Sequence, residues 1–164
     1  MKYAIVYSSQ TGNTKMLADT IRRELPEEDC VYFGRPDTAA LEAERIYVGF
    51  WTNRGTCDEE TAAFLKQIKG GEVYLFGTAG FGGKPEYFDT VLKKTEEKIR
   101  EGVKLIGSFM CQGKMPPAVR ERYEKMQSSG AKVPNIKALI ENFDKALTHP
   151  DPEDLEALGK AVRA

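Results

Sequence analysis

Short apolar runs rich in β-branched and aromatic residues alternate along this chain with longer amphipathic segments. This alternation limits the possible folds more than any other feature. The apolar runs are residues 1–7, 31–33, 46–50, 73–76 and 104–110. Helical periodicity is present in segments 14–25, 58–69, 85–99, 118–127, 136–147 and 152–163. Met16, Thr20 and Ile21 are expected on one face of the first segment, and the fifth has an apolar stripe formed by Ile136, Leu139, Ile140, Phe143 and Leu147. Asp151 before Pro152 is expected to cap the last helix. Strands that are apolar throughout are typical of a parallel sheet covered by helices on both faces, so the sequence predicts an α/β fold with five strands.

Three unusual loops, 8–14, 51–57 and 77–83, follow the first, third and fourth of these runs. Right-handed crossovers place the carboxyl ends of parallel strands at one rim of the sheet. Ligands of open α/β sheets bind at that rim. The three loops are therefore expected to form one binding site.

The turn Ser8–Thr14 contains hydroxyl and amide side chains and one glycine, between a strand and a helix. Such a turn offers backbone N–H groups and the positive end of a helix dipole to an anion. It lacks both the GxxxxGK[ST] pattern of nucleotide triphosphatases and the GxGxxG pattern of dinucleotide folds. A hydroxyl-rich helix cap is the simpler alternative. We predict that the turn holds the phosphate of a bound cofactor.

The other two loops suit a flat aromatic ring. Trp51 ends an apolar strand and begins a polar, glycine-containing loop, so a stacking surface is favoured over a core position. Gly55 permits a strained or turning peptide. The loop 78–83 offers backbone amides with little side-chain bulk, and Phe81 is a candidate second aromatic wall. The alternative is a flexible loop with Phe81 in a surface crevice.

The segment Tyr3–Thr14 resembles the opening of flavodoxins, whose turn follows a T/S-x-T-G-N-T pattern. The resemblance extends through the fifth strand and returns at the last helix. It implies a flavodoxin-like fold with strand order 2-1-3-4-5, helices on both faces, and FMN as cofactor. The implied FMN-binding residues are Ser9, Gln10, Thr11, Gly12, Asn13 and Thr14 for the phosphate, Trp51, Thr52, Asn53, Arg54 and Gly55 for one face of the flavin, and Thr78, Ala79, Gly80, Phe81 and Gly82 for its pyrimidine edge. In flavodoxins a peptide of the second loop turns to accept a hydrogen bond from the reduced flavin N5, and by position it lies within residues 53–55 here.

Two features depart from that family. Flavodoxins are usually strongly acidic, whereas this chain has 24 Lys and Arg against 25 Asp and Glu. We expect Arg54, Lys84 and Lys114 to lie at the ligand rim. Cations near the flavin favour its anionic reduced form, so we expect a less extreme low-potential reductant. The second departure is an extra helical segment, 113–147, before the last helix, which we expect to cover the cofactor or shape a docking surface. With the loops at 50–52 and 77–83, this segment resembles a subgroup of small flavodoxin-like proteins of anaerobic bacteria, one of which accompanies bacterial bilirubin reductase.

Composition and length limit the other kinds of protein that this chain could be. The balanced charge gives no basic field for nucleic acid, and no apolar run is long enough to cross a bilayer. Length fits one domain, 1–164, and the expected location is the cytoplasm. Three separated cysteines and one histidine indicate neither a disulfide framework nor a zinc site. Cys57 and Cys111 are expected to be buried packing residues rather than reactive thiols, and His149 is given no catalytic role.

The leading functional hypothesis is an electron carrier that passes electrons from a reductase to a partner enzyme, with no side chain acting as acid or base. The second is an FMN-dependent NAD(P)H:quinone-type oxidoreductase acting on a small substrate. The third is a non-redox binding module on the same fold, because a fold does not fix a function.

Overall fold

The computed structural model describes residues 1–81, 84–130 and 134–164. Five parallel strands form one sheet in the spatial order β2-β1-β3-β5-β6. They are β1 (Tyr3–Tyr7), β2 (Cys30–Gly34), β3 (Arg45–Asn53), β5 (Glu72–Ala79) and β6 (Lys104–Gln112). The two-residue strand β4 (Thr56–Cys57) pairs with β3 in the antiparallel direction. Apart from β4, the order is the predicted 2-1-3-4-5.

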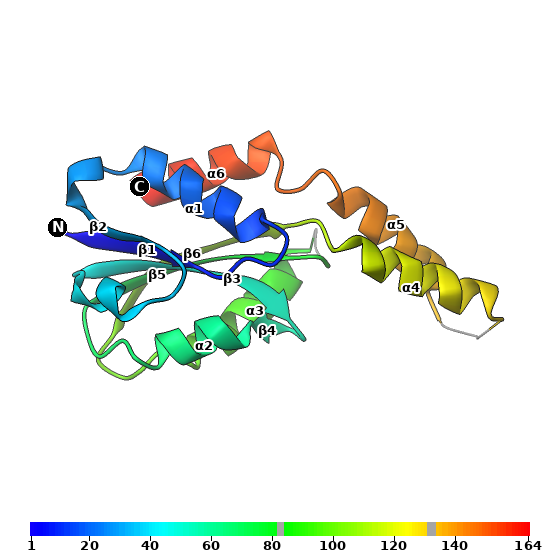
Figure 1. Ribbon diagram of the computed structural model, residues 1–164, viewed down its shortest axis with the longest axis horizontal. Coiled ribbons are helices and arrows are strands. Elements are labelled where there is room, and N and C mark those ends of the chain that lie inside the picture. Colours follow the sequence, from blue (N-terminus) through cyan, green and yellow to red (C-terminus); the bar gives the residue numbers. More distant parts are fainter. Residues whose placement is uncertain (82–83, 131–133) are drawn as a thin grey trace.

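Helices cover both faces of the sheet (Figure 1). On one face lie α1 (Asn13–Glu24) and α6 (Pro152–Arg163), and on the other lie α2 (Glu59–Leu65) and α3 (Pro85–Glu96). Two short 3₁₀ turns, η1 (Glu27–Asp29) and η2 (Thr38–Glu42), flank β2. The extra helices α4 (Pro117–Ser128) and α5 (Ile136–Ala146) extend beyond the carboxyl ends of the strands.

Alternate side chains of each strand enter two separate cores, as the two-residue period of a strand requires. In β5, Val73 and Leu75 join the core beneath α2 and α3, whereas Tyr74 and Phe76 join the core beneath α1 and α6. The helices contribute the residues that their periodicity predicts, including Phe64, Leu65 and Val91 to the first core and Leu17, Ile21 and Leu158 to the second.

Two glycines let aromatic rings cross the strands near the rim. A Cβ at Gly49 would lie 2.4 Å from the Phe76 ring, and one at Gly77 would lie 2.3 Å from the Phe50 ring. These glycines bring the backbones of β3 and β5 close to buried rings just before the loops of the predicted site.

Three local expectations were wrong. The segment 51–57 was expected to be a loop, but β3 continues to Asn53 and returns as β4 through Arg54 and Gly55. Met16 was expected on the buried face of α1 but is 36% exposed, because the buried face is formed by Leu17, Ala18 and Ile21. Leu147 was expected in the apolar stripe of α5, but the helix ends at Ala146 and Leu147 is 51% exposed.

The helices α4 and α5 pack against each other as a helical hairpin. Tyr123 and Phe143 are buried, yet among the described residues neither of the two sheet cores includes a side chain of either helix. Across the hairpin, the Arg120 guanidinium donates to both carboxylate oxygens of Asp144, at 2.9 and 3.0 Å. This hairpin is therefore an addition to the sheet domain and not part of its cores.

Candidate functional site

The turn between β1 and α1 leaves the amino end of α1 open to a ligand. Gly12 is the N-cap, has φ +89°, and caps the helix without a side-chain hydrogen bond. Its own N–H donates to the Ser9 hydroxyl at 3.1 Å, which tightens the turn. Because the first N–H groups of a helix lack intrahelical acceptors, this end attracts anions.

Two side chains of this turn point inward. The Thr14 hydroxyl donates to the Phe50 carbonyl at 3.3 Å, so it holds α1 on β3 rather than facing a ligand. The Asn13 amide donates to the Lys114 carbonyl at 2.8 Å, while its buried Oδ1 has no hydrogen-bond partner among the residues that the structure describes. A buried acceptor without a donor is costly, and a ligand that carries a donor would relieve that cost.

The second loop is a tight β-hairpin. Its two turn residues, Arg54 and Gly55, both have positive φ, at +54° and +83°. Positive φ at both central residues is the geometry of two-residue hairpin turns that match the twist of the flanking strands. Trp51 lies at the base of this hairpin, half-buried, and its backbone is bonded to Asp58, the N-cap of α2.

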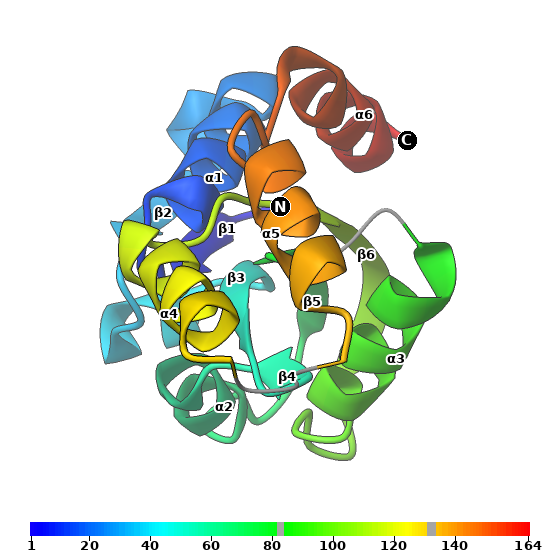
Figure 2. The same cartoon turned by 90° about the vertical axis from the view of Figure 1, so that its right-hand side faces the viewer.

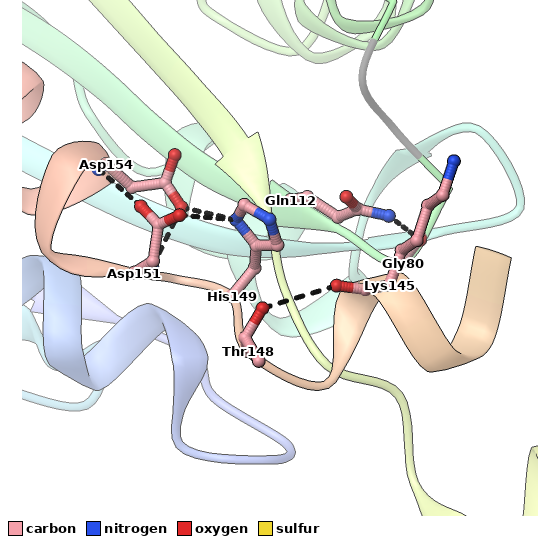
Figure 3. Close-up of polar contacts among 7 residues, drawn as sticks. All are labelled: Gly80, Gln112, Lys145, Thr148, His149, Asp151 and Asp154. Atoms are coloured by element: carbon pink, nitrogen blue, oxygen red, sulfur yellow. Dashed lines mark hydrogen bonds and ion pairs between the residues drawn. The ribbon is translucent and has the colours of Figure 1, made fainter.

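The third loop has its carbonyl groups engaged by neighbouring elements. The Thr52 hydroxyl donates to the Thr78 carbonyl at 2.8 Å. The carbonyl of Gly80 accepts from the side-chain amide of Gln112 at 3.0 Å (Figure 3). It also accepts from the side-chain amide of Asn142 at 3.1 Å. These bonds fix the backbone of the loop and connect it to the helical hairpin through Asn142 of α5.

All three loops contribute to one small cavity at the rim, with a volume of about 60 Å³. It is lined by Gln10, Thr11, Asn13, Trp51, Thr52, Thr78, Gly80, Lys114, Met115 and Pro116. Seven of these residues belong to the site predicted from sequence. Of the other predicted residues, Ser9 and Gly12 line a second hollow, Gly82 lies outside the described residues, and Thr14, Asn53, Arg54, Gly55, Ala79 and Phe81 line neither.

The second hollow lies against the same turn and has a volume of about 310 Å³. Besides Ser9 and Gly12 it is lined by Tyr7 and by the cations Lys15 and Arg35. Both cations already have carboxylate partners, since Lys15 contacts Asp19 at 3.0 Å and Arg35 contacts Glu60 at 2.9 Å. The turn therefore has two carboxylate-paired cations on the side of the second hollow, and Lys114 with uncharged polar groups on the side of the first cavity.

The main omission of the sequence-based site is Met115 and Pro116, in the segment that follows β6. Both line the cavity together with Lys114, which the sequence analysis had placed at the ligand rim. In the view of Figure 2, α4 and α5 lie in front of the carboxyl ends of β3 and β5. A glycine and two prolines directly after a strand were the available signal, but they do not say where the chain turns.

His149 has a partner that the sequence did not reveal. Its Nδ1 lies 2.7 Å from Asp154 Oδ2 and 3.7 Å from Asp151 Oδ2 (Figure 3). Both carboxylates belong to the capping box of α6, and the backbone N–H of Asp154 holds the pKa of Asp151 below its usual range, assisted by His149. The His149 carbonyl accepts from the Lys114 N–H at 3.0 Å, so this cluster anchors the cavity-lining segment.

The cysteines have the environment of packing residues. Cys57 and Cys111 are buried, and burial, with nearby carboxylates, raises the pKa of each thiol above its usual range. Reactive thiols need a lowered pKa. The structure thus favours the packing role expected from the sequence.

Comparison with known proteins decides the family. A model of the flavodoxin domain matches residues 4–163. This chain belongs to the flavodoxin-domain family. The flavodoxin-like domain-containing protein BilS of Clostridium symbiosum is 41% identical, with 96% of this chain and 92% of that protein covered.

Solved structures show the same fold. Oxidised flavodoxin 2 from Bacillus cereus aligns with a TM-score of 0.56 at 18% identity, covering 98% of this chain and 94% of that one. A flavoprotein in complex with FMN from Lactobacillus acidophilus aligns with a TM-score of 0.52 at 19% identity, covering 66% and 92%. The resemblance and the fold predicted from the sequence are both confirmed. No helix in the described part of the chain is long and apolar enough to span a membrane.

Proposed function

We propose that this flavodoxin-domain protein binds FMN and carries electrons between a reductase and a partner enzyme. The observation that supports this most directly is the meeting of three loops at one rim. An open helix end, a tryptophan at a hairpin base and a bare-backbone loop contribute to a single cavity. Each corresponds to one part of FMN, namely the phosphate, the ring face and the polar ring edge.

The residues present fit that cofactor. The open amino end of α1, with Lys15 and Arg35 beside it, suits a phosphate dianion. The buried Asn13 Oδ1 needs a donor, and a ribityl hydroxyl is one. Trp51 offers an aromatic face. When bound, FMN supplies the redox chemistry, while the protein binds it, orients it and sets the charge around it.

The carrier role is favoured over a quinone-type oxidoreductase by the match of the flavodoxin-domain model to residues 4–163. A quinone-type oxidoreductase would also need open space over the ring for a second small substrate. An electron carrier needs only an exposed edge of the flavin ring and a surface on which its partner protein docks. The sequence resemblance makes a bilirubin reductase the first acceptor to test, and the three free cysteines fit a cytoplasmic location.

Purified protein tests this proposal in two steps. FMN added to flavin-free protein should lose fluorescence and bind with one-to-one stoichiometry. The reduced protein should then pass electrons to a partner enzyme, while showing little steady turnover with NAD(P)H and a quinone alone. Fast turnover without a partner would select the oxidoreductase, and failure to bind FMN would select a non-redox module.

A further inference from the structure

The four residues Gly113–Pro116 cross the candidate site and are fastened on both sides. The N–H of Gly113 donates to the Ala79 carbonyl at 3.0 Å, which ties the segment to the end of β5. The next N–H, of Lys114, donates to the His149 carbonyl at 3.0 Å. We call these four residues the strap.

The strap is also bonded to the phosphate turn. The Lys114 carbonyl accepts from the Asn13 amide at 2.8 Å and from the Thr11 hydroxyl at 3.3 Å. A Cβ at Gly113 would lie 2.4 Å from Asn13 Nδ2, so glycine allows this close approach. The position of the strap over the turn is therefore set by specific contacts.

These contacts place Met115 inside the site. A Cβ at Gly80 would lie 2.4 Å from Met115 Cγ and 2.6 Å from its Sδ, so the thioether packs directly on the bare backbone of the third loop. Met115 lines the same cavity as Trp51 and Thr52. A soft, polarizable side chain thus shares one cavity with the predicted stacking residue.

Phe81, which the sequence predicted to be a second aromatic wall of the site, lies outside the cavity that Met115 lines. Its side chain is 44% exposed and does not line the cavity. A thioether can contact an aromatic ring favourably, and its three rotatable bonds let it adapt to the shape beside it. Adaptation matters here, because a 60 Å³ cavity admits a flavin ring only if its lining side chains move.

We propose that Met115 is a cofactor-contact residue that packs against the flavin ring, in the place that sequence reasoning gave to Phe81. This inference rests on the proposed FMN binding. The strap is then a fourth element of the cofactor site, added by the extra segment to the three loops of the family fold.

The test is the FMN dissociation constant of full-length, flavin-free protein, measured by quenching of flavin fluorescence. Met115→Ala should raise it about three- to ten-fold, the loss expected for one thioether–aromatic contact. Met115→Leu keeps most of the apolar contact and should stay within about two-fold of wild type. Met126→Ala is the matched control, because it removes the same type of side chain from α4, outside the cavity. Its dissociation constant, and that of Phe81→Ala, should stay within about two-fold of wild type.

Other outcomes would overturn the inference. Unchanged or tighter binding by Met115→Ala would mean that the side chain does not contact the ring or competes with it. If only Phe81→Ala weakened FMN binding, Phe81 would be the ring contact, as the sequence predicted. If the wild-type protein binds FMN and Met115→Ala has the same dissociation constant, only the role of Met115 is wrong. If the wild-type protein does not bind FMN, the proposed function is wrong as well. Matching thermal melts of the flavin-free variants exclude misfolding as a cause.

Discussion

Gly77 shows how strongly one residue near the rim is constrained. A methyl group there would lie 2.3–2.7 Å from three atoms of the buried Phe50 ring, which is fully enclosed. Gly77→Ala is therefore expected to lower the free energy of unfolding by about 1–3 kcal/mol, the usual cost of overpacking a core. Urea unfolding measures the change. Gly70→Ala, with open space around its Cβ, is the matched control and should be close to neutral.

Lys114 is the cation through which the strap can tune the cofactor. It lines the cavity and its side chain is exposed, whereas Lys125 is exposed on α4 away from the cavity. Removing a cation beside a flavin disfavours its anionic reduced form. Lys114→Gln should therefore make the midpoint potential more negative, by roughly 20 mV for a charge about 10 Å away in water.

Potentiometric titration of FMN-loaded protein at low salt measures this shift. Lys125→Gln is the control and should leave the potential unchanged. Equal shifts in both variants would show a general charge effect. An unchanged potential in Lys114→Gln would show that Lys114 does not influence the flavin. Added salt should reduce the Lys114 effect, because exposed charges are screened.

The sequence was most informative where one residue type has one local role. Asp151 before Pro152 predicted a capped helix start, and the structure adds the reciprocal bond from Asp154. The wrong expectations depend on tertiary context. Arg54 accepts a positive φ because strand pairing on both sides closes the turn, and Arg-Gly is not a recognised hairpin signal. No local pattern could place Met115 on Gly80, since the two are brought together only by the path of the strap.

Among the elements, the helical hairpin is the one that should unfold independently. Phe143 of α5 is buried, yet neither sheet core includes a side chain of α4 or α5 among the described residues. Phe143→Ala should therefore speed amide exchange in α4 and α5 by about two orders of magnitude, from a loss of about 3 kcal/mol. The exchange of β3 and β5 should hardly change.

Leu158→Ala is the contrasting variant, because Leu158 is fully buried in the core beneath α1 and α6. It should lower the global free energy of unfolding by about 2–5 kcal/mol and raise exchange throughout the sheet. Hydrogen exchange read by mass spectrometry distinguishes the two patterns. If Phe143→Ala destabilised the sheet as much as Leu158→Ala does, the hairpin would belong to the cooperative core.

For the molecule as a whole, buried acidic protons make stability depend on pH on the alkaline side. Burial raises the pKa of Tyr3 and of Tyr74 to about 12, and it also raises the pKa values of the Cys57 and Cys111 thiols. In the unfolded chain, thiols ionise near pH 8.5 and tyrosines near pH 10. Above about pH 9 the folded state therefore binds more protons than the unfolded state, so stability must fall as pH rises.

Each such group contributes a slope of about 1.4 kcal/mol per pH unit between its unfolded and folded pKa values. We expect the free energy of unfolding, measured with urea under reducing conditions, to fall by about 3 kcal/mol or more from pH 8 to pH 10.5. Tyr74→Phe should flatten the curve above pH 10, because it removes one proton that only the folded state retains. A stability that stayed level over this range would show that these phenol and thiol groups reach solvent in the folded protein, contrary to the two-core packing of the sheet.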